Sequence, residues 1–177
     1  PGEGVPPDPD LTVFNIGAVN LEENESKSPI PYKMPPDVIR EQDGTASNFR
    51  QLNEQSLSLE VCGLQDGDAR AAYRQIGMDV RSYKKLKMYV HGEYQSGAAA
   101  VNDDEVTVFI RLGTDFTDNY YEYEQPLKIT AHGTTSPALI WPTENNVEID
   151  FATLLDAKKS RNAAMNAPGS SVIIQQE

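Results

Sequence analysis

Apolar and polar residues alternate with a period of two through the middle of the chain, between residues 82 and 130. The alternation is clearest in the segments at 85–91, 106–112 and 120–129. Because successive side chains of a strand point to opposite faces, this period predicts three strands, each with one buried face. The residues that share such faces are Leu86, Met88 and Val90, then Val106, Val108, Ile110 and Leu112, then Tyr121 and Tyr123.

The same pattern predicts strands on both sides of this central region. It covers the segments at 55–62 and 147–151. Residues 11–20 could form a further short strand, with Val13, Phe14 and Ile16 as candidates for burial. The apolar residues 172–174 could add a final edge strand. Strand-like segments of this kind, separated by polar turns, are typical of an antiparallel β protein.

Turn and helix signals fill the intervals between the predicted strands. The intervals at 96–105 and 113–119 contain Gly, Asp and Asn, so we expect them to connect the three central strands in an antiparallel manner. Asp150 is a suitable cap for a helix near 151–164. The residues at 69–75 are compatible with one or two further helical turns.

Together these elements predict a mainly β fold, an antiparallel β-sandwich or jelly roll of the galactose-binding-like kind, with one or two short helices and an extended N-terminal arm. Residues 1–50 form the extended, proline-rich arm and loop, with one strand that could pack on the main domain. Residues 51–177 form the β-sandwich domain. The prolines at 29–36 exclude a helix or central strand, so we expect an extended segment lying over a surface. Residues 1–10 have the composition of a linker in a piece cut from a longer protein.

The net charge of the chain argues against two classes of binding partner. The 177 residues include 27 acidic and 15 basic side chains, which gives a formal net charge of −12. This charge argues against nucleic acid and anionic lipid, since both attract a positive surface. No apolar run approaches the length of a membrane helix, so we expect no direct membrane insertion. The single cysteine, Cys62, lies in a predicted strand, where a small buried side chain is the usual interpretation.

Two acidic loops are candidates for a calcium site. They contain Asp103, Asp104 and Glu105 in one loop, and Asp115 and Asp118 beside Asn119 in the other. Loop carboxylates at the rim of a β-sandwich can bind Ca²⁺. The spacing lacks the alternating ligands of a dedicated calcium loop, so solvated turn carboxylates are the favoured interpretation.

An aromatic group and an acid–base group are the other candidates. Exposed aromatic residues could stack on sugars, although tyrosines in strands are more often half-buried packing residues. An acid–base pair could be drawn from His91, His132, Glu93 and Glu122, but no motif brings two of them together. We therefore assign no catalytic, cofactor-binding or metal-binding residue, and expect no enzyme and no cofactor. The aromatic residues are Tyr89, Tyr94, Tyr120, Tyr121, Tyr123 and Trp141.

Several sequence segments are long and unusual. They are LNEQSLSL at 52–59, CGLQDGDARAAY at 62–73, YKKLKMYVH at 83–91, FIRLGTDFTDNYYEYEQPLK at 109–128 and IWP at 140–142 followed by ENN at 144–146. These segments resemble the SprA/Sov family of Bacteroidota outer-membrane proteins. The resemblance extends over most of the chain, from about residue 11 to residue 162.

This resemblance implies a role in export of folded cargo by the type IX secretion system and in gliding motility. The chain would be a non-catalytic domain of a very large translocon, acting in scaffolding or partner contact. Its partners would be other parts of the translocon, associated secretion proteins and exported cargo, at the periplasmic or extracellular face of the outer membrane. A carbohydrate-binding module at the cell surface is the alternative from a different class, and a glycan hydrolase is a third.

Overall fold

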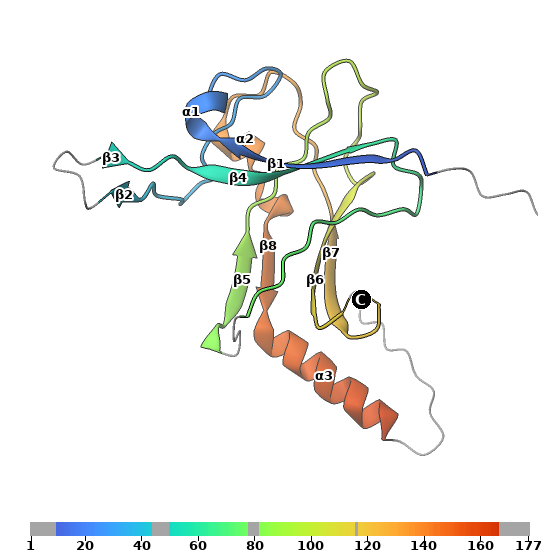
Figure 1. Cartoon of the computed structure of the whole chain (residues 1–177). Helices are drawn as coiled ribbons and strands as arrows, with labels where there is room; N and C mark the ends of the chain where they lie inside the picture. Colours follow the sequence, from blue (N-terminus) through green and yellow to red (C-terminus); the bar gives the residue numbers. More distant parts are fainter. Residues whose placement is uncertain (1–9, 44–49, 78–81, 116, 167–177) are drawn as a thin grey trace, which may run out of the picture.

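A computed structural model describes residues 10–43, 50–77, 82–115 and 117–166 (Figure 1). The predicted linker at 1–10, apart from its last residue, and the predicted edge strand at 172–174 lie outside the described residues. The strands are β1 (Val13–Asn20), β2 (Gln42–Asp43), β3 (Arg50–Gln51), β4 (Gln55–Cys62), β5 (Lys85–Met88), β6 (Thr107–Gly113), β7 (Tyr120–Pro126) and β8 (Val147–Asp150). The helices are α1 (Leu21–Asn24), α2 (Pro137–Ile140), the 3-10 turn η2 (Thr143–Asn145) and α3 (Phe151–Met165).

The strands pair antiparallel in four two-stranded sheets, β1–β4, β2–β3, β5–β8 and β6–β7. The mainly β, antiparallel fold with few helices is thus confirmed, whereas the β-sandwich or jelly roll is not, because the described strands do not join into two large packed sheets. β5 was expected to pair with the next central strand, and this was wrong. It pairs with β8 instead, since the interval at 96–105 is a long excursion and not a hairpin turn.

The β6–β7 hairpin confirms the predicted turn between these strands. Leu112 lies opposite Tyr121 and Ile110 opposite Tyr123, so their side chains share one half-buried face. Gly113 closes the hairpin where a Cβ would collide with the backbone of Asn119 and Tyr120. Glycine is required here by this close approach of the backbone.

The core lies where the proline-rich segment meets α2. Ile30 and Tyr32 pack with Ile140 and Trp141, and all four side chains are at most 7% exposed. The segment at 29–36 contains no helix or strand, as predicted. The expectation that it lies over a surface was wrong, because it supplies half of this buried cluster. Prolines keep the chain extended, and an extended chain can insert alternate side chains into a core.

Two helix predictions have different outcomes. The helix near 151–164 is confirmed as α3, and the Asp150 side chain caps it by accepting a hydrogen bond from Ala152 N at 2.9 Å. The helix predicted at 69–75 was wrong, since these residues contain no regular secondary structure. A seven-residue segment cannot offset the cost of helix nucleation unless packing supports it.

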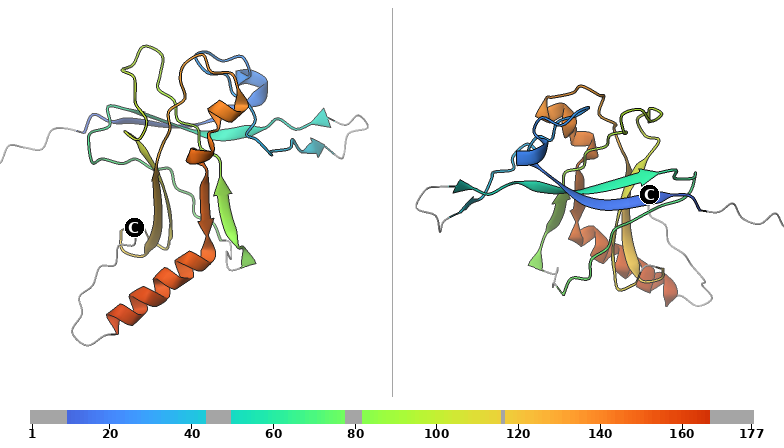
Figure 2. Two further views of the ribbon diagram at one scale, coloured as in Figure 1. Left: turned by 180° about the vertical axis from the view of Figure 1, so that it is seen from behind. Right: turned by 45° about the horizontal axis from the view of Figure 1, so that its top comes forward.

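The β1–β4 pair, which we call the ribbon, runs across the other strand pairs. Figure 1 shows it crossing at one end of β5–β8 and β6–β7, while α3 extends away at the opposite end. The two further views in Figure 2 show the same arrangement. The proposed division at residue 50 stays a prediction. Residues from both sides of it pair in the ribbon and pack in the core.

Candidate interaction site

One face of the ribbon carries six apolar side chains in three successive opposed pairs, followed at one end by the polar pair of Asn20 and Gln55. In an antiparallel pair, residues directly opposite each other project to the same face. The register places Phe14 opposite Val61, Ile16 opposite Leu59 and Ala18 opposite Leu57. These six residues define what we call the ribbon face. The other face carries mostly small or polar residues, including Asn15, Gly17, Ser56, Ser58 and Glu60.

The ribbon face is uncovered in the structure. Leu57 is 64% exposed, Ile16 58% and Leu59 46%. Val61 and Ala18 are exposed as well, and Phe14 is half-buried. The strand at 11–20 and the alternation at 55–62 were predicted correctly, but the expectation that their apolar residues would be buried was wrong, since Val13, Ile16 and Leu57 are exposed. Contiguous exposed apolar side chains of this kind mark interaction surfaces in folded proteins.

The core holds one end of the ribbon in place. The hydroxyl of Tyr32 donates to Glu54 Oε2 at 2.5 Å and lies 2.7 Å from Ser56 Oγ. Burial and the hydrogen bond to Glu54 raise the pKa of Tyr32 well above its ordinary value of 10.0, so the phenol keeps its proton. Because Tyr32 also packs edge-on against Trp141, with ring centroids 6.2 Å apart, it connects β4 directly to the buried cluster.

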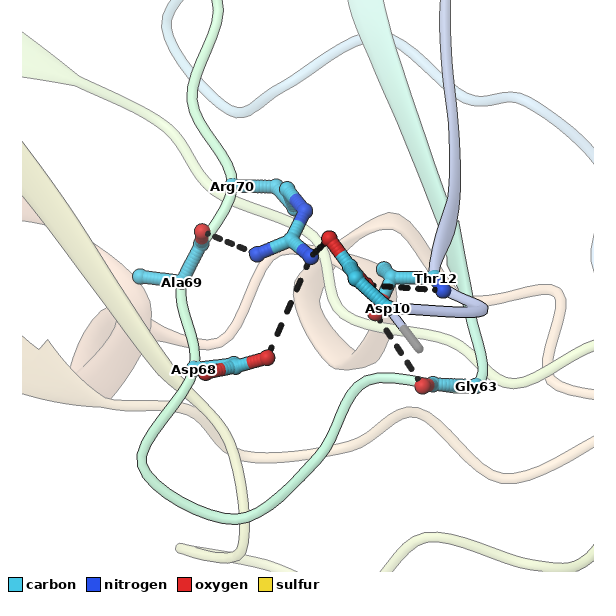
Figure 3. Close-up of polar contacts among 6 residues, drawn as sticks. All are labelled: Asp10, Thr12, Gly63, Asp68, Ala69 and Arg70. Carbon is cyan, nitrogen blue, oxygen red and sulfur yellow. Dashed lines mark hydrogen bonds and ion pairs between the residues drawn. The ribbon is translucent and has the colours of Figure 1, made fainter. Parts of the chain in front are cut away.

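A polar cluster holds the other end of the ribbon (Figure 3). The Arg70 guanidinium forms an ion pair with Asp10 and lies 3.9 Å from Asp68. Thr12 donates its hydroxyl to the Gly63 carbonyl oxygen at 3.2 Å and its N–H to Asp10 Oδ1 at 3.0 Å. The hydrogen bonds from Thr12 and the nearby Arg70 lower the pKa of Asp10. The chain leaving β4 is thereby fastened to the chain entering β1. We call this group the Arg70 clasp.

The first acidic loop is a structural element. Asp104 forms an ion pair with Lys128 at 2.8 Å, and Asp103 Oδ1 accepts from Ile129 N at 2.8 Å. Glu105 accepts hydrogen bonds from both the backbone and the side chain of Asn102, and these bonds lower its pKa. The carboxylates therefore face partners within the protein: Asp103 and Asp104 both approach the Lys128 ammonium, and Glu105 bonds to Asn102.

The second acidic loop is the turn of the β6–β7 hairpin. Asp115 accepts hydrogen bonds from the backbone N–H groups of Thr117, Asp118 and Asn119 at 2.7–3.0 Å and from Asn119 Nδ2 at 2.6 Å. The side-chain bond from Asn119, followed by the backbone bonds, lowers the pKa of Asp115 far below its ordinary 3.8. Within the described ranges, no group of three or more His, Cys, Asp or Glu residues is placed to hold a metal ion.

The aromatic residues divide between the core and the surface. Trp141 is 6% exposed, donates Nε1–H to the Lys33 carbonyl oxygen at 2.8 Å and packs against Tyr89. Tyr94 stacks on His132, with ring centroids 4.0 Å apart. The Arg111 guanidinium covers Tyr120, 4.4 Å from its ring centroid. Tyr121 and Tyr123 are half-buried on the hairpin. The six aromatic residues therefore form no common platform.

The acid–base candidates also lie in separate environments. His91 packs against Trp141, where burial lowers its pKa, so the imidazole is neutral near pH 7. His132 Nε2 lies 2.9 Å from the Tyr94 carbonyl oxygen. Glu93 forms an ion pair with Lys27 at 3.3 Å, and Glu122 forms one with Arg111. Of the four, only His91 and Glu93 interact electrostatically.

A comparison with protein families identifies the chain's relatives. A family model described as motility related/secretion protein, SprA_N, matches residues 6–176. The chain belongs to this family. The match confirms the resemblance to the SprA/Sov family that the sequence phrases indicated. A search of curated proteins found no match.

Family membership gives the ribbon face its biological context. The SprA_N family connects the chain with protein secretion and motility, with a larger complex and with the cell envelope. Within the part of the chain that the structure describes, no helix is long and apolar enough to cross a membrane. A domain of such a complex needs surfaces for neighbours, and the ribbon face is an exposed apolar surface of this type.

Sequence reasoning missed three features of this region. The Arg70 clasp joins residues 60 positions apart, and no local pattern signals such a contact. The exposed state of Cys62 corrects the expectation of a buried thiol. It lies opposite Val13, on the other side of the ribbon from the ribbon face. The apolar composition of the ribbon face was visible in the alternation, but alternation does not reveal whether a face is covered.

Proposed function

We propose that the chain is a non-catalytic interaction domain of a large outer-membrane translocon of the type IX secretion system, with a role in gliding motility. Its task is scaffolding or partner contact. The observation that carries this proposal is the ribbon face, where six apolar side chains lie side by side on two paired strands without a cover. Membership in the SprA_N family supports the assignment to secretion and motility.

The ribbon face is large enough for its burial to stabilise contact with a neighbouring protein. Its three opposed pairs extend over five residues of each strand, roughly 17 Å by 10 Å, or about 170 Å². At about 25 cal/mol per Å², covering this area contributes roughly 4 kcal/mol before the costs of association. Leaving such a face in water is unfavourable, so a neighbour that covers it stabilises the assembled state.

The proposed location is the periplasmic or extracellular side of the outer membrane. The proposed partners are other parts of the same translocon, associated secretion proteins and exported cargo. The acidic net charge of −12 supports protein partners over nucleic acid or anionic lipid. The sequence segments between residues 11 and 162 that resemble the SprA/Sov proteins support the same assignment.

Sugar binding and catalysis receive less support. A sugar platform requires exposed aromatic faces, whereas Trp141 is buried and Arg111 covers Tyr120. A hydrolase requires two carboxyl groups across a cleft. The carboxylates that we considered are Glu93, which pairs with Lys27, and Glu122, which pairs with Arg111. We therefore favour the interaction domain over both alternatives.

Secretion by cells tests this function directly. Leu57 and Leu59 are replaced together by Asn in the full-length protein, and secretion of cargo and gliding are measured. We expect both to fall several-fold at an unchanged level of the protein, because the double substitution removes the apolar contact without creating a charge. Glu60→Asn, on the opposite face of the same strand, is the control and should behave as wild type. Normal secretion by the double variant would refute the proposal.

A further inference from the structure

The ribbon combines its apolar face with open backbone edges. The outer edges of β1 and β4 pair with no third strand among the described residues, since the sheet has two strands. The register runs without a bulge through eight opposed pairs, from Val13–Cys62 to Asn20–Gln55. A long, regular edge of this kind is a template for a further strand.

β1 lacks the devices that usually protect an edge. Its sequence, VFNIGAVN, contains no charged residue and no proline. Natural edge strands are commonly blocked by lysine, proline, bulges or short length. β4, by comparison, carries the charged residue Glu60. The unprotected edge of the ribbon is therefore the β1 edge.

The hydrogen-bond pattern of the β1–β4 pair determines which backbone N–H groups of β1 face away from β4. They belong to the β1 residues of the ribbon face. Leu21 N donates to Glu54 O at 2.9 Å, and these two residues continue the β1–β4 register. Since pairs in an antiparallel ladder alternate between bonded and non-bonded, Gly17 and Val19 point their amides toward β4. Phe14, Ile16 and Ala18 point theirs outward. One added strand could thus bond these amides and extend the ribbon face at the same time.

The area of the ribbon face and the charge near the ribbon indicate which kind of partner binds there. The ribbon face offers about 170 Å², well below the roughly 800 Å² per partner of a standard interface, so a second copy stacked on this face would not form a stable dimer. A strand added at the edge gains main-chain hydrogen bonds in addition to apolar contact. The chain at the ends of β1 and β4 carries more acidic than basic residues, namely Glu22 and Glu23 after β1, Glu54 before β4, and Asp66 and Asp68 after it. Of these, Glu22 pairs with Arg40 and Asp68 lies beside Arg70, while Glu23, Glu54 and Asp66 form no ion pair with any of the described residues.

We propose that the β1 edge accepts an extended segment of a partner protein, which alternates apolar and polar residues and is flanked by lysine or arginine. The segment pairs with the outward amides and carbonyls of Phe14, Ile16 and Ala18, and its apolar side chains continue the ribbon face. The basic flanks lie near the acidic residues at the ends of the ribbon. This inference rests on the proposed function, since it specifies the partner of the same surface.

Peptide binding to the 177-residue chain tests this inference. The probe is an eight-residue peptide of alternating Val and Thr, flanked by two lysines at each end. We expect amide hydrogen exchange at Phe14, Ile16 and Ala18 to slow about tenfold or more at saturation, while exchange at Gly17 and Val19 stays unchanged. Protection confined to Gly17 and Val19, or no binding, would overturn the proposal.

Three altered peptides separate the contributions of main-chain hydrogen bonds, apolar alternation and basic flanks to binding. N-methylation of the amides along one edge of the probe should weaken binding about tenfold or more, because main-chain hydrogen bonds are lost. The same composition with its four valines in succession should bind more weakly, and so should a probe with glutamate flanks. Equal binding of all four peptides, or protection that appears with rising protein concentration without peptide, would contradict a strand partner.

A pair of variants tests the same edge from the side of the protein. Ala18→Pro removes an outward N–H and should abolish protection by the probe, whereas Ala18→Val keeps the N–H and should preserve it. If Ala18→Pro disturbs the ribbon itself, the N-methylated peptide still decides the question with unaltered protein. A loss of secretion in cells together with failure of every peptide would reject this inference and leave the proposed function standing.

Discussion

Asn145 is a fully buried amide that joins two segments far apart in the sequence. Its Oδ1 accepts from Lys128 N at 2.7 Å and its Nδ2 donates to Lys128 O at 2.8 Å. The side chain therefore bonds the backbone of Lys128 as a neighbouring strand would. Asn145 is 0% exposed, and burial of a side-chain amide is favourable only when the amide forms its hydrogen bonds. These two bonds explain why this position requires asparagine.

Replacing Asn145 by Ala should destabilise the fold by about 2–4 kcal/mol, because two buried hydrogen bonds are lost and the N–H and C=O of Lys128 remain unpaired. Urea unfolding followed by circular dichroism measures this change. The neighbouring exposed substitution Glu144→Gln should change the free energy of unfolding by less than about 0.5 kcal/mol. Equal stability of the two variants would show that Asn145 does not hold the core segment.

Asp115 should make the stability of the β6–β7 hairpin depend on pH. The hydrogen bonds from Asn119, Asp118 and Thr117 lower its pKa in the folded state, so its contribution is complete above the ordinary value of 3.8 and is lost as the pH falls toward the folded value. Wild type should therefore have a higher urea midpoint than Asp115→Ala at pH 6, and this difference should shrink below pH 4. A difference that is constant or grows on acidification would contradict this account.

At the scale of elements, the ribbon depends on contacts at its two ends. Tyr32 fixes one end to the core through Glu54 and Ser56, and the Arg70 clasp fixes the other. Between these ends the ribbon face has no cover. This arrangement presents a straight, accessible pair of strands, which is the geometry that a partner strand requires.

Breaking the Arg70 clasp should loosen the ribbon at one end only. In Arg70→Ala, we expect amide exchange near Thr12 and Gly63 to rise several-fold, because the ion pair that fastens the chain after β4 is gone. Exchange near Ser56 should stay unchanged, since Tyr32 holds that end. Arg70→Lys is the matched control, which keeps the charge and should show a smaller rise. Uniform acceleration along the ribbon would contradict two independent fastenings.

Local sequence patterns predicted the positions of several strands. They could not predict which strands pair or which segments pack together, because those contacts join residues far apart in the sequence. Alternation located β4 and β6 within one residue of their ends, because the period is a property of the strand itself, and it placed the end of β7 three residues too late. It could not show that β5 pairs with β8, since many strands share the same pattern. Prolines correctly indicated an extended segment at 29–36, but burial of Ile30 and Tyr32 depends on α2, about 110 residues away.

The candidate site was predictable in part. The apolar alternation at 55–62, which supplies half of the ribbon face, was evident in the sequence. The acidic loops have internal partners such as Lys128, which no spacing rule reveals. Whether a face is covered depends on the tertiary arrangement, and for the ribbon face the structure was needed to show its exposure.

For the whole molecule, the described core is small and the ribbon face is a contiguous group of mostly exposed apolar side chains, while further exposed apolar residues such as Ile39, Leu139 and Leu155 lie elsewhere. Family membership connects the chain to secretion and motility, in which domains work as parts of larger complexes. A net charge of −12 keeps the remaining surface well solvated. The ribbon face is thus the part of the molecule best suited to contact a neighbour, and the unprotected β1 edge specifies how.

Site-specific photo-crosslinking of the full-length protein in cells tests this account most directly. A photoreactive amino acid replaces either Ile16 on the ribbon face or Asn15 on the opposite face of the same strand. Both positions are exposed in the structure. We predict a defined crosslinked product from Ile16, to a partner or to another part of the same protein, and little from Asn15. Equal crosslinking at both positions, or none at Ile16, would contradict the role of the ribbon face.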